Sequence, residues 1–230
     1  MGRRVQRYGL AVLILTLLLG SAAHAASPDT VINQATAALR EMAAEPDAAT
    51  MASLIKEARG VAIFPSVVKA GIFLGGKYGE GLVLQRDQET GAWYGPSFVT
   101  MKGVSYGLQF GVQSTALVLV INNDEGMERF RGAQEFTLGG DIGIAAGPMG
   151  RQAGASTDVQ LKSAIYSYSM SKGLFAGFSL EGAIIETDHD ANRDYWGNAF
   201  SPEKILELAA NDSRVEVLVH ELERLMDQGR

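Results

Sequence analysis

Ser105 lies in a stretch that matches a catalytic motif. Residues Gly103 to Gly107 have the sequence Gly-Val-Ser-Tyr-Gly, the Gly-x-Ser-x-Gly pattern in which many hydrolases carry a nucleophilic serine. That serine needs a sharp turn from a strand into a helix, whereas the residues after Ser105 keep the two-residue alternation of a strand. A catalytic triad would also need His189 or His220. We therefore expect no enzymatic activity, with a serine esterase as the less favoured alternative.

A second candidate for chemistry is a run of alternating acidic and amide side chains. Aspartate and asparagine alternate as in the first half of a calcium-binding loop, at Asp188, Asp190, Asn192 and Asp194. Arg193 stands where that loop needs glycine, and Ala199 where it needs a bidentate glutamate. The simpler interpretation is a solvated polar turn before Tyr195 and Trp196, whose rings pack in the core or lie at an interface. We expect no metal ion or other cofactor.

Basic side chains beside apolar ones form the third candidate, a surface for lipid headgroups. From Lys56 to Arg86 the chain carries five basic and two acidic residues, a net charge of +3. Phosphate headgroups attract lysine and arginine, and exposed apolar side chains can enter the acyl boundary. The alternative is that the lysines are solvated strand ends and the apolar residues belong to the core. The candidate lipid-binding residues are Lys69, Lys172, Lys56, Arg59, Lys77, Phe73 and Phe175.

Two carboxylates interrupt otherwise apolar, glycine-rich segments. Asp141 and Glu181 alternate with apolar residues and stand beside Gly140 and Gly182. If they are buried they need a partner, and Arg151 is available as one. We interpret the three as a structural ion pair network in preference to a functional site.

The overall charge limits the classes of partner. Without the three arginines at positions 3, 4 and 7, the chain holds 17 basic and 26 acidic side chains, a net charge of −9. Such a chain is a poor ligand for nucleic acid. It contains no cysteine, so neither disulfides nor a lipidated cysteine can be formed.

The first 25 residues have the pattern of an export signal. Three arginines precede an apolar run from Leu10 to Leu19, and Ala23-His24-Ala25 supplies the small-x-small cleavage pattern. A membrane anchor is the competing interpretation, but the run is short for a bilayer. We expect a leader over 1–25, cleavage after Ala25, a single domain over 26–230, and a periplasmic location, where the protein could be peripheral to a membrane.

Helical and strand periods divide the remaining chain. Capping patterns and apolar residues at helical spacing predict helices near both ends, at about 28–45, 51–59, 201–206 and 213–226, and another at 124–131. Between the ends the period changes to two, and 22 of the 27 glycines lie between Gly60 and Gly182. Glycine inside a strand marks a bend or a close approach of another backbone. We predict an α+β fold: a strongly curved antiparallel barrel-like or sandwich-like sheet with N- and C-terminal helices packed on it.

Four ordered segments resemble the signatures of the SYLF domain family. They are "ARGVAIFPSVVKAG", "LVINNDEGMERF", "LGGDIGIAAGPMGR" and "SKGLFAGFSLEG", and the likeness extends from about Met51 to Gly197. The family occurs in bacterial exported proteins and eukaryotic endocytic adaptors. Its members are described as binding phospholipids, and some eukaryotic members bind phosphoinositides or actin. The resemblance therefore implies a binding module without known catalytic activity.

These observations together predict a non-catalytic phospholipid-binding module at the bacterial cell envelope. Its expected partner is an anionic phospholipid or membrane surface. The alternative from another class is a structural or partner-binding envelope protein, whose protein partner the sequence does not identify.

Overall fold

The structure is a computed structural model. It describes the backbone of residues 25–45, 48–132, 134–148, 163–171, 174–175 and 179–228, and the side chains of these residues except 71–74, 105–111 and 174–175. Four of the predicted site side chains therefore lie outside the described part: Phe73, Arg151, Lys172 and Phe175.

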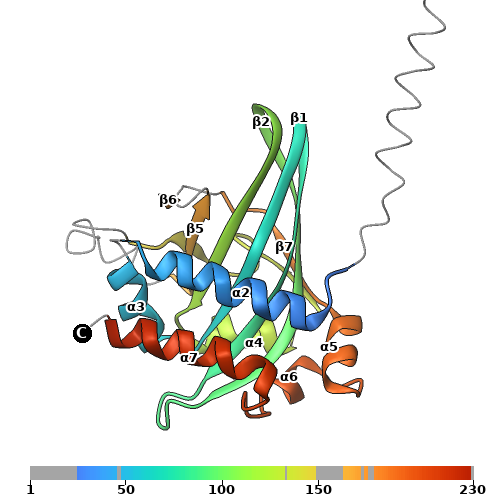
Figure 1. Ribbon diagram of the computed structural model, residues 1–230. Helices are drawn as coiled ribbons and strands as arrows, with labels where there is room; N and C mark the ends of the chain where they lie inside the picture. Colours follow the sequence, from blue (N-terminus) through green and yellow to red (C-terminus); the bar gives the residue numbers. More distant parts are fainter. Residues whose placement is uncertain are drawn as a thin grey trace, which may run out of the picture.

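Two very long strands form the centre of the fold (Figure 1). Strand β1 (Gly60–Arg86) and strand β2 (Trp93–Ile121) are antiparallel partners from the Gly60–Ile121 pair to the Arg86–Trp93 pair. Five short strands complete a seven-stranded sheet in the order β3-β7-β2-β5-β4, with β1 on β2 and β6 on β5. The short strands are β3 (Glu135–Thr137), β4 (Ile144–Ala146), β5 (Ile165–Ser171), β6 (Leu174–Phe175) and β7 (Ile184–Thr187).

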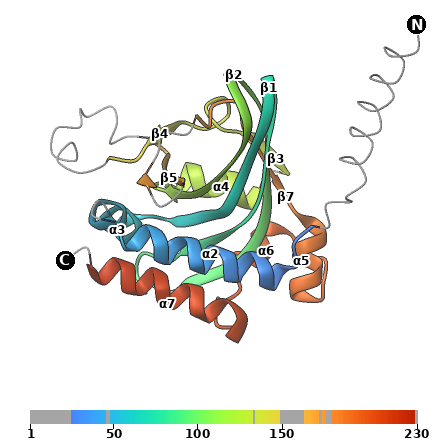
Figure 2. The same ribbon diagram turned by 45° about the horizontal axis from the view of Figure 1, so that its top comes forward.

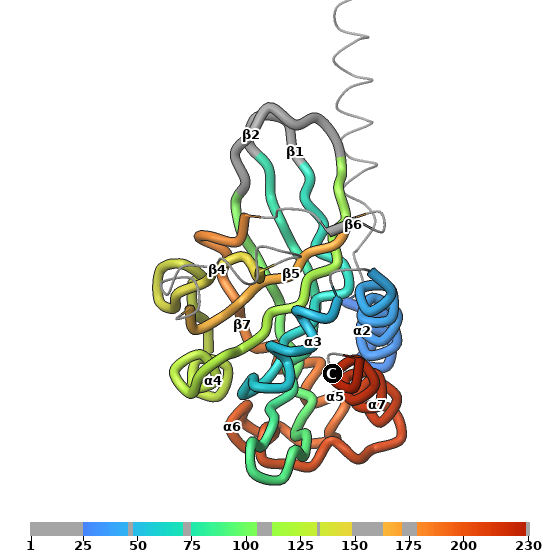
Figure 3. Tube along the Cα trace, turned by 90° about the vertical axis from the view of Figure 1, so that its left-hand side faces the viewer, coloured from blue at the N-terminus to red at the C-terminus, as the bar shows by residue number. Residues whose placement is uncertain are grey.

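The β1–β2 hairpin bends over on itself, so that the two halves of β1 lie side by side (Figure 3). The backbone N–H of Arg86 donates to the carbonyl of Arg59 across this contact, at 2.8 Å. A Cβ on Gly60 would lie 2.6 Å from the Leu84 carbonyl oxygen, and one on Gly81 2.5 Å from the Ile63 carbonyl oxygen. Glycine is required because the two halves approach more closely than any side chain permits.

Helices cover one face of the sheet (Figure 2). The described helices on this side are α2 (Pro28–Ala43), α3 (Ala48–Glu57), α5 (His189–Trp196) and α7 (Ser213–Gln228). Their apolar stripes bury a first core against alternate residues of the long strands, including Ile63, Leu82 and Val118. None of the described helices is long and apolar enough to cross a membrane.

The opposite face of the sheet holds a second core. Helix α4 (Asp124–Gly132) packs there with the residues that alternate with the first set, such as Phe64, Val83 and Leu119. Phe130 of α4 meets Phe136 of β3 edge to face, with ring centroids 4.9 Å apart. Helix α6 (Pro202–Ile205) adds Leu206, which follows it, to this core. The α+β class, the curled sheet and the helices at both ends are as predicted.

Two local predictions differ from the structure. The run from Asp188 to Asp194 was expected to be a polar turn, but it forms α5, because the Asp188 carboxylate caps the helix by accepting the N–H of Ala191 at 2.9 Å. Asp141 and Glu181 were expected in strands, yet each lies in a turn that contains a glycine of positive φ, Gly139 at 80° or Gly182 at 73°. Glycine supplies the left-handed backbone that these turns need.

Candidate functional site

The end of the sheet where the hairpin bends over rises above the helices (Figures 1 and 3). We call this end the apex and define it by the described side chains of 68–70, 75–77, 102–104 and 112–114. The register of the two strands shifts here, because Gly71 pairs with Gly111 while Phe73 pairs with Gly107. The apex therefore combines an irregular register with three glycines, Gly75, Gly76 and Gly103.

Three apolar side chains of the apex are exposed. Val112 is 76% exposed, Val104 61% and Val68 38%. Each alternates with residues that face the second core, so all three lie on the helix-covered face of the sheet, beyond the helices. Isolated exposed valines need no explanation, but three on one glycine-rich bend form a protruding apolar surface.

The predicted lysines of the apex face the other way. Lys69 is half-buried, and it shares the face of Lys77 because eight residues separate them along the strand. The Lys77 side chain is only 6% exposed and lies on Gly103, where a Cβ would be 2.9 Å from its Cε. Its Nζ donates to the Ser179 carbonyl at 2.9 Å. Burial first, and then the charge of Lys69, lowers the pKa of Lys77.

We expected Lys77 at the surface, where a headgroup could reach it. Instead, the Lys77 amine donates to the Ser179 carbonyl and links the 179–181 segment to β1. Lys69 is the candidate of this pair whose side chain remains accessible. Lys172 lies outside the described residues, but Ser171 just before it donates to the Ser114 carbonyl at 3.4 Å, within the apex.

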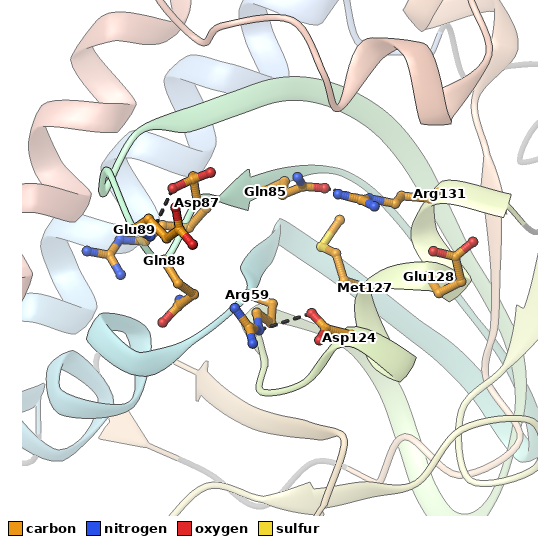
Figure 4. Close-up of a pocket in the computed structure, with 10 residues that line it drawn as sticks. Arg59, Gln85, Asp87, Gln88, Glu89, Asp124, Met127, Glu128 and Arg131 are labelled. Carbon is orange, nitrogen blue, oxygen red and sulfur yellow. Dashed lines mark hydrogen bonds and ion pairs between the residues drawn. The ribbon is translucent and has the colours of Figure 1, made fainter.

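The other two predicted basic residues lie at the opposite end of the hairpin. Lys56 is exposed near the end of α3, and Arg59 lines a cleft of about 300 Å³ between the β1–β2 turn and α4 (Figure 4). Three arginines and four carboxylates line this cleft: Arg59, Arg86, Arg131, Asp87, Glu89, Asp124 and Glu128.

The arginines of the cleft are held by the protein itself. Arg59 Nε lies 3.0 Å from Asp124 Oδ1, and Arg131 Nε donates to Gln85 Oε1 at 2.7 Å. Arg86 Nη1 donates to the Lys56 carbonyl at 2.6 Å. Figure 4 shows the Arg59–Asp124 ion pair at one side of the cleft. Since the carboxylates outnumber the guanidinium groups, the cleft is not a strong anion site.

The predicted ion pair of Asp141, Glu181 and Arg151 lacks the burial on which it was based. Both carboxylates are exposed, so neither needs a partner for that reason. Asp141 Oδ2 accepts the backbone N–H of Thr137 at 2.7 Å and thereby closes its turn. The Glu181 side chain lies over Gly139, whose missing Cβ would be 3.1 Å from its Cγ. Arg151 lies outside the described residues.

The catalytic and calcium alternatives find no supporting geometry. Ser105 lies within continuous β2 opposite Gly75, so its backbone does not form the strand-to-helix elbow of a hydrolase nucleophile. Asn192 is 2% exposed and binds both backbone groups of Phe98, through Oδ1 at 2.8 Å and Nδ2 at 3.1 Å. Within the described ranges no group of three His, Cys, Asp or Glu side chains could hold a metal ion.

The aromatic pair after this run is largely core. Tyr195 is 4% exposed, and the Arg214 guanidinium stacks on its ring at 3.8 Å. Trp196 donates from Nε1 to the Pro96 carbonyl at 3.1 Å. The Tyr195 ring also packs on Phe98 of β2, with ring centroids 5.4 Å apart, so both side chains fasten α5 to the sheet.

Sequence reasoning did not single out Val104 and Val112. Both follow the two-residue alternation of their strand as buried valines do, so this period could not separate them from the core. The available signal was their position beside clustered glycines, Gly103 and Gly107 for one and Gly111 for the other.

The described residues define an α+β fold, a curled sheet between two apolar cores with helices at both ends. Comparison with known proteins shows the family to which this fold belongs. Residues 102–225 match the family model Ysc84, described as "Las17-binding protein actin regulator". The chain belongs to this family, which confirms the resemblance to the SYLF domain.

Several eukaryotic proteins are similar to the chain. Protein YSC84 of Saccharomyces cerevisiae is 39% identical over 155 residues, which is 66% of this chain and 33% of that protein. LAS seventeen-binding protein 3 of the same species is 36% identical over 155 residues, covering 66% and 33%. Human SH3 domain-containing YSC84-like protein 1 is 35% identical over 151 residues, covering 66% and 44%. The matched region thus spans a third to less than half of these relatives.

Proposed function

We propose that the protein is a non-catalytic phospholipid-binding module of the bacterial cell envelope, which meets the membrane through the apex. The single observation that carries the proposal is the exposure of Val104 and Val112, at 61% and 76%, on the protruding end of the sheet. Aliphatic side chains at a protruding end can enter the acyl boundary without any change in the fold.

The charge for the contact comes from the lysines near the apex. Each lysine close to an anionic bilayer adds on the order of 1 kcal/mol of attraction. Lys69 is the accessible candidate, and Lys172, Phe73 and Phe175 are the further candidates by sequence. Lys56 and Arg59 lie at the far end of the hairpin and do not take part in this contact.

Export places the protein where such a membrane is available. The leader predicted over 1–25, ending in Ala-x-Ala, supports a periplasmic location for the chain from Ala26. The family resemblance described above supports lipid as the ligand, because SYLF members bind phospholipids.

Flotation with liposomes tests the proposal. Purified protein should float with vesicles of phosphatidylglycerol and phosphatidylethanolamine at low salt, and the bound fraction should fall as salt rises. Val104→Glu combined with Val112→Glu should weaken binding at least tenfold, because burying one valine is worth about 1.5 kcal/mol or more. Lys69→Glu combined with Lys172→Glu should weaken it as well.

A matched control distinguishes the general effect of an added negative charge from a specific effect at the apex. Val217 is 47% exposed on α7, remote from the apex, so Val217→Glu should bind vesicles like the unchanged protein. The proposal is wrong if the unchanged protein fails to float with anionic vesicles at low salt. It is also wrong if Val217→Glu weakens binding as much as the apex variants do.

A protein partner is the second candidate function. It is favoured by the family description, which names Las17 binding and actin regulation for related proteins. If this chain works in that way, it should ignore vesicles and instead co-purify with an envelope protein. Ester hydrolysis that disappears in Ser105→Ala would show the third possibility, an esterase.

A further inference from the structure

The backbone nitrogen of Ala26 makes an unusual contact for a residue at the edge of a fold. Its N–H donates to Glu80 Oε2 on β1 at 2.9 Å. Ala26 is partly buried against the first core, and the next residue, Ser27, caps α2 by accepting the N–H of Thr30. The nitrogen of Ala26 is therefore held in place by its hydrogen bond to Glu80 and by the capped helix that begins two residues later.

Glu80 lies in acidic surroundings. Its Oε1 accepts the hydroxyl of Tyr78 at 3.0 Å. Burial, and then Glu80, Asp188 and Glu186, raise the pKa of Tyr78 to about 12, which places three carboxylates around one phenol. Lys102 is the nearby cation, and it pairs with Glu186.

No described lysine, arginine or histidine forms an ion pair with Glu80. The half-buried carboxylate thus has one neutral N–H and one hydroxyl as its described donors. A carboxylate that is partly removed from water is stabilised most by a positive charge at hydrogen-bonding distance.

Ala26 is also the residue that the predicted cleavage would leave first in the chain. We propose that Glu80 is the docking site for the free α-ammonium of Ala26, which forms when the leader is removed after Ala25. This inference rests on the proposed export and does not depend on lipid binding.

The chemistry of processing supplies the missing charge at that atom. A signal peptidase breaks the bond between the Ala25 carbonyl carbon and the Ala26 nitrogen by adding water. The oxygen of the water stays with Ala25 as part of a carboxylate, and the nitrogen of Ala26 takes up protons to become an ammonium. A neutral N–H donor 2.9 Å from Glu80 becomes a cation with three donors at the same place.

The position of this cation explains why it needs a carboxylate. It stands one residue before the cap of α2, where the helix dipole disfavours positive charge. Asp29, in the first turn of α2, already pairs with Arg214, whose Nη1 lies 3.8 Å from Asp29 Oδ1. Glu80 is the carboxylate in direct contact, so it compensates both the ammonium and its unfavourable place at the helix start.

The test compares chains that differ only at the N-terminus. One form begins at Ala26 with a free amine, and the other keeps a Gly-Ser extension that leaves an amide there. NMR titration of the Ala26 α-amine should give a pKa at least half a unit above the ordinary value of about 7.7–8.0. Glu80→Gln should remove that elevation, whereas Glu41→Gln, an exposed carboxylate on α2, should leave it unchanged.

Thermal unfolding provides an independent measurement. The form beginning at Ala26 should melt higher than the extended form by about 1–3 °C, and the difference should disappear in Glu80→Gln. An α-amine pKa that Glu80→Gln does not change would overturn the docking. Mass spectrometry of the exported protein checks the other premise, because a chain that starts elsewhere than Ala26 would overturn the cleavage site while leaving the lipid-binding test unaffected.

Discussion

Gly81→Ala should destabilise the protein strongly although it adds a single methyl group. A Cβ at this position would lie 2.5 Å from the Ile63 carbonyl oxygen and 2.6 Å from Cδ1 of Phe64. Ordinary contacts start near 3.4 Å, so the overlap approaches 1 Å. Ile63 and Phe64 are fully buried, and part of the overlap is with backbone, so no rotation of a side chain relieves it.

The expected loss follows from the cost of overpacking. Extra methyl groups in a well-packed core cost about 1–3 kcal/mol, and a clash with backbone belongs at the upper end of that range. We expect Gly81→Ala to lower the free energy of unfolding by about 3 kcal/mol. For a domain of this size the melting temperature should fall by about 6–12 °C.

Gly76→Ala provides the matched control. Gly76 is also inside β1, but it is exposed and a Cβ there would have nothing within 4 Å. Replacing glycine by alanine where the backbone tolerates it stabilises by about 0.4–1 kcal/mol, because the unfolded chain loses freedom. Equilibrium urea unfolding of both variants measures the difference. If the two free energies of unfolding agree within about 0.5 kcal/mol, the doubled-over packing of β1 is refuted.

Two further predictions concern contacts away from the apex. Asn192→Ala should lower the free energy of unfolding by about 2–4 kcal/mol, because it leaves the buried backbone N–H and carbonyl of Phe98 without their partner. Equilibrium urea unfolding measures this loss, and a loss below about 0.5 kcal/mol contradicts the prediction. Burial opposes the charge of Glu221, but hydrogen bonds from Arg40 and Arg224 outweigh it and hold the pKa of Glu221 below its ordinary 4.5. The ionised carboxylate therefore stabilises the fold above about pH 4.5, and this stabilisation is lost as the pH falls through the lower pKa of the folded state. The melting temperature of Glu221→Gln should therefore change less between about pH 5 and 3 than that of the unchanged protein.

The sequence was most informative where one local signal decides the structure. Ser27-Pro28 predicts the start of α2, and the Asp87–Gly91 turn signal predicts the end of the long hairpin. Clustered glycines predict a sheet that bends or brings backbones together, and Gly60 and Gly81 do bring the two halves of β1 together. Each of these features depends on residues close to one another in the chain.

The features that could not be predicted depend on what covers a side chain. Lys77 and Lys69 share a face of β1, yet Lys77 is buried, with its amine on the Ser179 carbonyl, whereas Lys69 is half-buried. Val112 follows the same period as core valines, yet its side chain is 76% exposed. Alternation fixes which side chains share a face, but it does not say whether another element covers that face.

The glycines of the hairpin connect stability to the proposed function. Because Gly60 and Gly81 let the two halves of β1 pack directly, the sheet must bend over between them, and the apex projects beyond the helices (Figure 1). Among the described side chains of the apex, Val104 and Val112 are 61% and 76% exposed. The close-packed glycines and the exposed valines thus result from the same bend of the sheet, but the glycines affect stability and the valines affect the proposed membrane binding. Gly81→Ala should reduce stability by a direct clash, whereas glutamate at the apex should reduce membrane binding while leaving the melting temperature nearly unchanged, because those valines bury little area within the fold.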